Sequence, residues 1–381
     1  MGNDSITDTL LKGNVGIGTN DPSQLLEISG GDMQLDNTTH ANEDGIIYKG
    51  ATPFIHNFNY GDNGTVTTAG QNTFVGINAG NLTMGSTATG TYHASNNTFM
   101  GYGAGISNTI GYYDSFIGAY AGQANTTGSA NSFMGRDAGY SNTVGHYNSF
   151  VGVHAGYSNT TGDYNSFMGY SAGYSNTTGD NNSFIGAYAG RYQNDGSTGL
   201  QTPENSVYLG TNTKSGSDPA GGEDAITNEI VIGYNAIGNG SNTVTLGNTS
   251  ITKTILEGNI GIGTTSPSVL LDVYGTSNKL RLSYDGSVYT DMQTTNAGFF
   301  NINTTGSAIS MSDGLSIGSS YASTSPPSNG LLVEGYVGIG NTSPEAALHI
   351  GTTSYSNLTT LSDSVMISGE LEVAGNAYLG P

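Results

Sequence analysis

Few residues of this chain have the type and spacing needed for catalysis. Two carboxylates in one groove would suit glycoside hydrolysis, and Asp137, Asp163 and Asp180 lie in the same repetitive stretch. They occupy scattered positions beside turns, where aspartate is expected for conformational reasons alone. The chain contains no cysteine, which excludes a thiol nucleophile. We therefore predict no catalytic residues and a protein that is not an enzyme, with polysaccharide depolymerase as the least favoured alternative.

The histidines do not form a metal-binding pattern. His93, His146, His154 and His349 are each isolated, without the His-x-His spacing that would place two imidazoles side by side. The calcium-binding repeat Gly-Gly-x-Gly-x-Asp is also missing. We expect no metal-binding and no cofactor-binding residues. Calcium at exposed Asp and Asn turns stays open as an alternative.

Tyrosines form the one candidate binding surface. Tyr140, Tyr157 and Tyr174 occupy the same position in successive repeats, so they would line up in a column. Sugars stack on exposed aromatic rings, which makes these three side chains candidate glycan-facing residues. The alternative is that the rings pack on one another and cover the edge of each repeat.

The elements that would position these side chains repeat every 17 residues. Each unit starts with Asn or Asp, followed two residues later by phenylalanine and then by Met, Ile or Val. Glycines interrupt the unit too often for a helix, because each costs about 1 kcal/mol in a helix interior. A short strand bounded by glycine turns fits better. The repeat-core phenylalanines are Phe99, Phe116, Phe133, Phe150, Phe167 and Phe184.

Alternation along such a strand divides its side chains between two faces. If phenylalanine fills the inside of a coil, the next aliphatic residue points outward and forms a regular column that needs cover. The economical cover is an identical chain, although a monomeric solenoid is the alternative. One further position is always asparagine in the complete units and would form a stacked amide ladder: Asn108, Asn125, Asn142, Asn159 and Asn176.

Composition excludes several classes of protein. The 381 residues include 60 glycines, only 10% charged residues and a net charge of −21. This balance argues against nucleic-acid partners, which require clustered Lys and Arg, and against anionic membrane surfaces. We expect no membrane insertion, because no apolar run is long enough to span a bilayer. The first residues also lack the features of a secretory signal peptide.

One phrase occurs three times outside the 17-residue units. It begins Gly13-Asn-Val-Gly-Ile-Gly-Thr, Gly258-Asn-Ile-Gly-Ile-Gly-Thr and Gly335-Tyr-Val-Gly-Ile-Gly-Asn, with Pro and a Leu-rich stretch after it. It lacks the third glycine and the helix of a dinucleotide site. We interpret it as a small β-module. The resulting segments are module 1–30, short-strand connector 31–71, solenoid 72–250 with 17-residue and looser 14-residue repeats, module 251–275, antiparallel region 276–334, and 335–381 with a third module and a C-terminal strand pair.

These phrases resemble phage and phage-like tail fibre proteins of the kind that carry a C-terminal intramolecular chaperone of the S74 peptidase type. Residues 228–246 are similar to the head β-roll of trimeric adhesins of the YadA type. The resemblance implies a homotrimer in a virion or an extracellular filament. The main period is 17 instead of 14, and the start of an S74 domain is absent. We therefore hypothesise that the chaperone was released by self-cleavage after Pro381.

Together these patterns predict an all-β fold: an elongated trimeric β-solenoid or β-roll fibre with small β-modules at both ends. The predicted function is structural, as the shaft or spacer of a tail fibre or filament that contributes to host or surface attachment. Its partners would be copies of itself, other fibre or particle proteins, and a cell-surface receptor or glycan. The main alternative is a surface adhesin or glycan-binding module.

Overall fold

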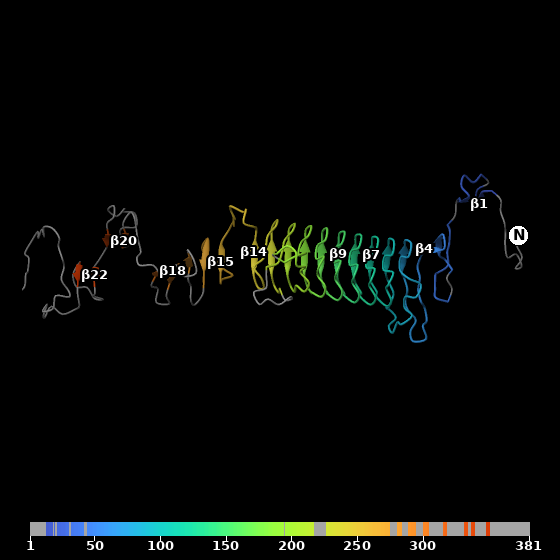
Figure 1. Ribbon diagram of the computed structural model, residues 1–381, viewed down its shortest axis with the longest axis horizontal. Helices are drawn as coiled ribbons and strands as arrows, with labels where there is room; N and C mark the ends of the chain where they lie inside the picture. Colours follow the sequence, from blue (N-terminus) through green and yellow to red (C-terminus); the bar gives the residue numbers. More distant parts are fainter. Residues whose placement is uncertain are drawn as a thin grey trace, which may run out of the picture. The chain divides into compact units, whose positions relative to one another are not determined.

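A computed structural model describes residues 13–17, 19, 21–29, 32–41, 44–193, 195–216 and 226–274, together with the strands between 280 and 350 that are given below (Figure 1). The predicted C-terminal strand pair lies outside the described residues. The chain divides into two compact units, Met1–Thr254 and Ile255–Pro381. Each unit is described by itself.

The first unit is built on one twelve-stranded sheet in which each strand pairs with its neighbours in sequence. From β5 to β14 all pairs are parallel. The register places each phenylalanine from Phe74 to Phe167 opposite the next one, and Phe184 opposite Tyr208. Parallel pairing of consecutive short strands requires one complete coil between them, so the predicted β-solenoid of repeats is confirmed. The strands are β3 (Ile47–Lys49), β4 (Thr52–His56), β5 (Thr73–Val75), β6 (Thr98–Met100), β7 (Ser115–Ile117), β8 (Ser132–Met134), β9 (Ser149–Val151), β10 (Ser166–Met168), β11 (Ser183–Ile185), β12 (Val207–Leu209), β13 (Ile230–Ile232) and β14 (Val244–Leu246).

The two strands at the N-terminal edge of this sheet run differently. β3 and β4 form an antiparallel hairpin, and β4 pairs antiparallel with β5. The segment assigned from sequence to a connector therefore adds two strands to the solenoid sheet. The buried His56 ring lies 4.9 Å from the ring of Phe74 and covers the first phenylalanine of the solenoid.

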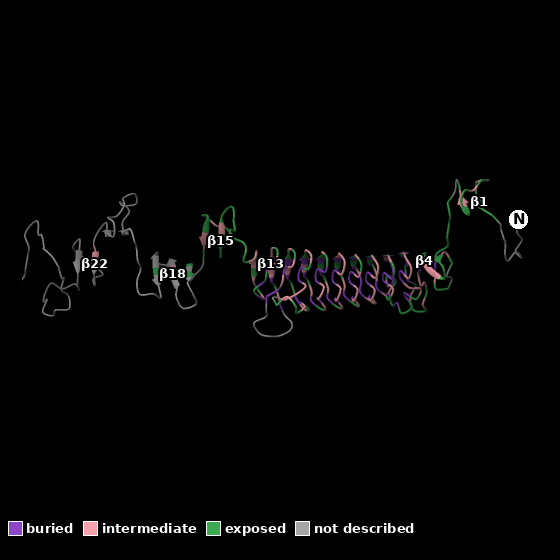
Figure 2. Ribbon diagram, turned by 45° about the horizontal axis from the view of Figure 1, so that its top comes forward, coloured by how far each residue is buried: buried purple, intermediate pink, exposed green. Residues whose placement is uncertain are grey.

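The core of the solenoid is a single file of phenylalanine rings. All six repeat-core phenylalanines are fully buried. Ring centroids from Phe99 to Phe184 lie 4.7–4.9 Å apart with interplanar angles of 5–12°, which is the spacing of neighbouring strands. Buried alanines, such as Ala138 and Ala155, fill the remaining space in each coil. Buried positions thus recur in every coil (Figure 2).

Two columns of buried polar side chains hold successive coils together. In the predicted ladder, Nδ2 of Asn125, Asn142, Asn159 and Asn176 each donates to Oδ1 of the equivalent residue one coil earlier, at 2.8–3.1 Å. A second column is formed by the first residue of each unit, whose side-chain oxygen accepts the backbone N–H of its equivalent in the next coil. Asn148 N donates to Asn131 Oδ1 at 3.0 Å in this way. Both columns give partners to buried amides, apart from Asn176 Oδ1 at the end of the ladder, which is buried without one.

Glycine is required where coils approach most closely. Gly135 has φ +144°, and a Cβ at this position would collide with the carbonyl oxygen of Gly152 in the next coil. The equivalent glycine recurs after each outward aliphatic residue, which explains its fixed place in the unit.

The repeated phrase forms one two-stranded parallel sheet at each occurrence. In the first unit β1 (Val15–Ile17) pairs with β2 (Leu26–Ile28). In the second unit β15 (Ile260–Ile262) pairs with β16 (Leu271–Val273), and β22 (Val337–Ile339) pairs with β23 (Leu348–Ile350). The second unit also contains the predicted antiparallel sheet, formed by β17 (Leu280–Ser283), β18 (Tyr289–Thr294) and β19 (Phe300–Thr304), and a parallel pair of β20 (Leu315–Ile317) with β21 (Leu331–Val333).

Candidate functional site

The outer face of the solenoid sheet carries an apolar column, one residue from each strand. These residues follow the core residue of each strand and point away from the core. Exposed fractions range from 36% at Ile117 to 56% at Leu246, whereas Val75, Val151 and Ile232 are half-buried. The outward aliphatic column consists of Val75, Met100, Ile117, Met134, Val151, Met168, Ile185, Leu209, Ile232 and Leu246.

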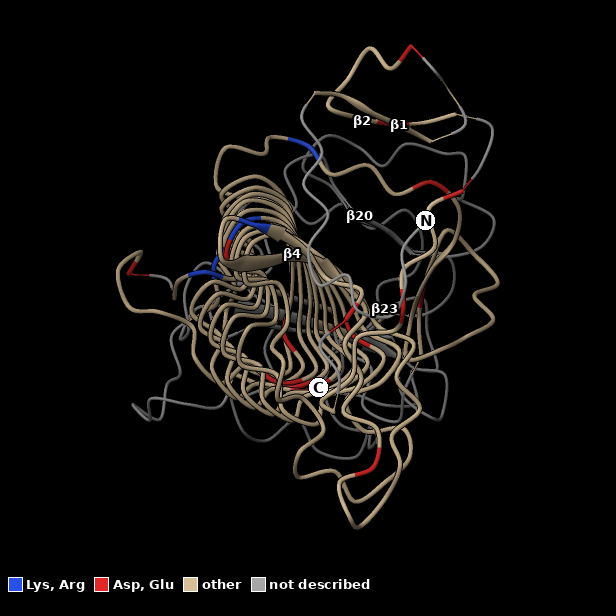
Figure 3. Ribbon diagram, turned by 90° about the vertical axis from the view of Figure 1, so that its right-hand side faces the viewer, with Lys and Arg blue, Asp and Glu red and all other residues tan. Residues whose placement is uncertain are grey.

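A second outward position precedes the core residue of each strand. It holds Thr or Ser from β5 to β11, for example Ser132 and Ser149, which are exposed. From β12 onward it becomes aliphatic, with Val207, Ile230 and Val244. The two outward positions of each strand are therefore uncharged. From β12 to β14 both positions are apolar, so the apolar strip on the outer face is wider there. Figure 3 shows that Lys, Arg, Asp and Glu occupy few positions along the coils.

The small modules also expose apolar side chains. In the first module Leu25 is 79% exposed and Leu26 is 57% exposed. In the second module Leu270, Leu271 and Ile262 are similarly uncovered. An isolated two-stranded sheet is marginally stable in water because it has no second layer to cover its apolar face.

The predicted glycan-facing tyrosines pack on one another. The rings of Tyr140, Tyr157 and Tyr174 are stacked in sequence, with centroids 5.0 Å apart and interplanar angles of 7° and 4°. The guanidinium of Arg191 lies 4.5 Å above Tyr174 at the end of the column. Burial among these neighbours raises the pKa of the Tyr157 hydroxyl. Because each inner ring has both faces covered, this column offers little ring surface to a sugar.

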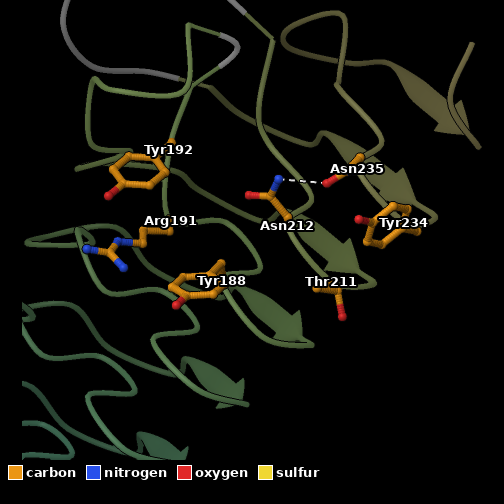
Figure 4. Close-up of a pocket in the computed structure, with 7 residues that line it drawn as sticks. All are labelled: Tyr188, Arg191, Tyr192, Thr211, Asn212, Tyr234 and Asn235. Atoms are coloured by element: carbon orange, nitrogen blue, oxygen red, sulfur yellow. Dashed lines mark hydrogen bonds between the residues drawn. The ribbon is translucent and has the colours of Figure 1, made fainter.

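A pocket of about 410 Å³ opens where the 17-residue period breaks (Figure 4). It is lined by Tyr188, Arg191, Tyr192, Thr211, Asn212, Tyr234 and Asn235. The register places Phe184 opposite Tyr208, a separation of 24 residues, and the extra residues form a small hairpin bridged between Tyr192 and Gly199. Sequence reasoning missed this pocket, although the lengthened spacing after Phe184 was a signal for it.

The carboxylates considered for catalysis serve structural contacts. Asp163 Oδ1 accepts the backbone N–H of His146 at 2.6 Å, and Asp180 Oδ1 accepts that of Asp163 at 2.7 Å. Asp137 pairs with Arg136 and with His154 Nε2, each at 3.2 Å. Asp163 and Asp180 therefore form a further ladder of hydrogen bonds between coils.

One arrangement resembles a Ser-His-Asp relay and was overlooked in the sequence. Asp137, His154 and Ser171 follow one another at the same position of three coils, and Ser171 lies within Gly169-Tyr-Ser-Ala-Gly173, which has the spacing of a nucleophile elbow. Ser171 is only 1% exposed, however, and makes no hydrogen bond to His154 in the described structure. Its left-handed φ recurs at this position in the neighbouring coils, so it reflects the coil geometry.

The histidines are held by unrelated local contacts. His146 Nδ1 accepts the N–H of Ser129 at 3.0 Å, and His93 lies against Tyr92 and Tyr112. The side chain of His349 lies outside the described residues. Among the residues that the structure describes, no three His, Asp or Glu side chains converge as a metal site. Calcium binding stays an untested alternative.

Comparison with known protein families, curated proteins and solved structures finds no significant match to this chain. Within the part of the chain that the structure describes, no helix has the length and apolar character needed to cross a membrane.

Proposed function

We propose that this chain is a structural fibre protein, the shaft or spacer of a phage-like tail fibre or extracellular filament, in which three identical chains associate. The observation that carries the proposal is the outward aliphatic column, which extends across every strand from β5 to β14. A soluble protein rarely leaves a long contiguous apolar strip uncovered. A second copy has the same period along the same sheet and therefore matches the strip coil by coil.

The length of the column makes association favourable. Covering one half-exposed aliphatic side chain stabilises by about 1 kcal/mol, while association costs about 4–15 kcal/mol in lost freedom of motion. A single coil would not overcome that cost, but the full column approaches or exceeds it. The repetition of the unit thus supports a shaft function, because each added coil lengthens the rod and strengthens its interface.

The small modules support the same proposal. The first and second modules expose leucine and isoleucine side chains on two-stranded sheets that cannot cover them. Three such sheets around a common axis would supply the missing layer. In this account other fibre or particle proteins bind the ends of the rod, and the shaft holds a receptor-binding element away from the particle.

A pair of charge substitutions tests the proposed interface. Met134→Glu combined with Met168→Glu places two carboxylates in the column, and we expect the double variant to have a smaller mass than the native assembly in light scattering. Val144→Glu is the matched control, because Val144 is 38% exposed and outside the strands of the sheet. Circular dichroism checks that the coils persist. A double variant with the native mass would contradict the proposed interface.

The alternative function is a surface adhesin or glycan-binding module. The observation that favours it is the aromatic pocket at Tyr188, Tyr192 and Tyr234. The two functions are compatible, since a shaft can carry a lateral binding site.

A further inference from the structure

The pocket at the period break brings three tyrosines, Tyr188, Tyr192 and Tyr234, together around a pair of asparagines. Tyr234 is 67% exposed and makes no ring contact with another described residue. Tyr188 contacts Tyr170 edge to face at 5.2 Å, and the Arg191 guanidinium lies 5.3 Å from its ring. Figure 4 shows Tyr188 and Tyr192 on one side of Asn212 and Tyr234 on the other. An exposed ring face packs well against the apolar C–H surface of a pyranose.

The floor of the pocket supplies polar groups at fixed positions. Asn212 and Asn235 both adopt left-handed φ in successive coils, and Asn212 Nδ2 donates to Asn235 Oδ1 at 2.7 Å. This pairing leaves Asn212 Oδ1 and Asn235 Nδ2 without a partner among the described residues. One amide acceptor and one amide donor are therefore available to adjacent hydroxyl groups of a ligand. A volume of about 410 Å³ is within the usual range for small-ligand sites.

Arg191 adds a positive charge that has no anionic partner in the described structure. Its guanidinium lies 4.8 Å from the ring of Tyr192 and 5.3 Å from that of Tyr188, and Nε is buried without a hydrogen-bond acceptor. Its Nη groups make no hydrogen bond to a described residue and are not among the buried atoms, so these two groups stay available to a ligand. None of the residues that line the pocket is acidic, although the chain has 29 acidic residues and only 8 basic ones.

We propose that this pocket binds a carboxylated sugar of an acidic polysaccharide or glycan. The tyrosines would stack on the sugar ring, the paired asparagines would bind hydroxyl groups, and Arg191 would bind the carboxylate through charge-assisted hydrogen bonds. This proposal goes beyond the shaft function and is independent of it, because the pocket residues are not members of the outward aliphatic column.

The test is binding of the full chain to immobilised oligosaccharides that contain galacturonic or N-acetylneuraminic acid, beside neutral galactose oligosaccharides. We expect binding to acidic members of the panel. Arg191→Gln should weaken that binding by about tenfold or more, and Tyr234→Ala should weaken it similarly. Tyr164→Ala is the control, because Tyr164 is 57% exposed and outside the pocket; it should bind like the native chain.

Three results would overturn the proposal: no binding to any acidic oligosaccharide, equal binding to the neutral set, or equal loss in Tyr164→Ala and Tyr234→Ala. Melting curves establish that each variant is folded, and Tyr234 is exposed enough for truncation to leave the coils intact. Light scattering on Arg191→Gln separates this proposal from the shaft function, since the assembly mass should not change.

Discussion

Asp114 Oδ1 accepts two hydrogen bonds from Asn131 in the next coil, one from the backbone N–H at 2.9 Å and one from Nδ2 at 3.2 Å. Asparagine fills this column in the other regular coils, and there its Nδ2 also donates to a glycine carbonyl, as Asn131 does to Gly145 at 2.9 Å. A carboxylate cannot make that second bond. Complete burial raises the pKa of Asp114 well above its usual range, so the folded chain favours the protonated acid.

Asp114→Asn should therefore stabilise the solenoid at neutral pH, by about 1–3 kcal/mol. Because the folded state raises the pKa of Asp114, its favourable contribution is complete below the ordinary value of 3.8 and declines as the pH rises. The stability gap between the variant and the native chain should widen from about pH 4 to about pH 7. Chemical denaturation across this range measures the gap, and a gap that is constant with pH would refute a raised pKa of Asp114.

His56 should make the N-terminal cap sensitive to acid. Its Nε2 lies 3.1 Å from the carbonyl oxygen of Ala79, and Nδ1 accepts the N–H of Phe58 at 3.4 Å, which fits a neutral ring. Burial lowers the pKa of His56 below 6.5. The neutral His56 ring thus makes its full contribution to folding stability above pH 6.5. That contribution is lost as the pH falls through the lowered pKa.

Hydrogen exchange of β4 and β5 tests this behaviour. After correction for the intrinsic exchange rate at each pH, we expect the amides of β4 and β5 to lose protection below pH 6.5 in the native chain. In His56→Gln, which keeps a donor for Ala79, we expect little change in their protection. Strand β9, far along the sheet, is the internal reference. Equal acid sensitivity of β4 in the native chain and the variant would show that another group controls the cap.

Removal of one ring from the phenylalanine file should be costly. Phe150 is fully buried between Phe133 and Phe167, with centroids 4.8 and 4.9 Å away. Phe150→Ala should lower the free energy of unfolding by about 3–5 kcal/mol, since it removes apolar contacts and leaves a cavity. Val144→Ala on the surface of the preceding coil should cost less than about 1 kcal/mol. Denaturant titrations of both variants provide the comparison; similar losses would mean that the file is not the core of the solenoid.

The amide ladder gives a similar prediction. Asn142 Nδ2 donates to Asn125 Oδ1 and to the Gly145 carbonyl, and its own Oδ1 accepts from Asn159. Asn142→Ala would leave three buried polar atoms with one partner fewer, at a cost of about 1–3 kcal/mol. Thr161→Ala, at an exposed position of the following coil, is the control. Melting temperatures are measured for both variants. If neither differs from that of the native chain, the ladder does not stabilise the solenoid.

The general architecture could be predicted from the sequence because a strict period fixes which residues stack. The 17-residue spacing of phenylalanine predicted short strands and one coil per unit, and the alternation within Ser-Phe-Met predicted an outward aliphatic residue. The pocket could not be predicted, because it depends on how the residues after Tyr188 fold back over the next coils. The structural role of Asp163 was also hidden, since its partner is a backbone N–H in another coil. Oligomeric state depends on surfaces between chains and stays a prediction.

The most direct test of the shaft proposal is the mass of the native particle in solution, measured by light scattering. The account predicts a particle of about 117 kDa, three chains of 39.1 kDa, that stays assembled on dilution. A stable single chain of 39.1 kDa would contradict it, because the outward aliphatic column would then have no cover from an identical chain.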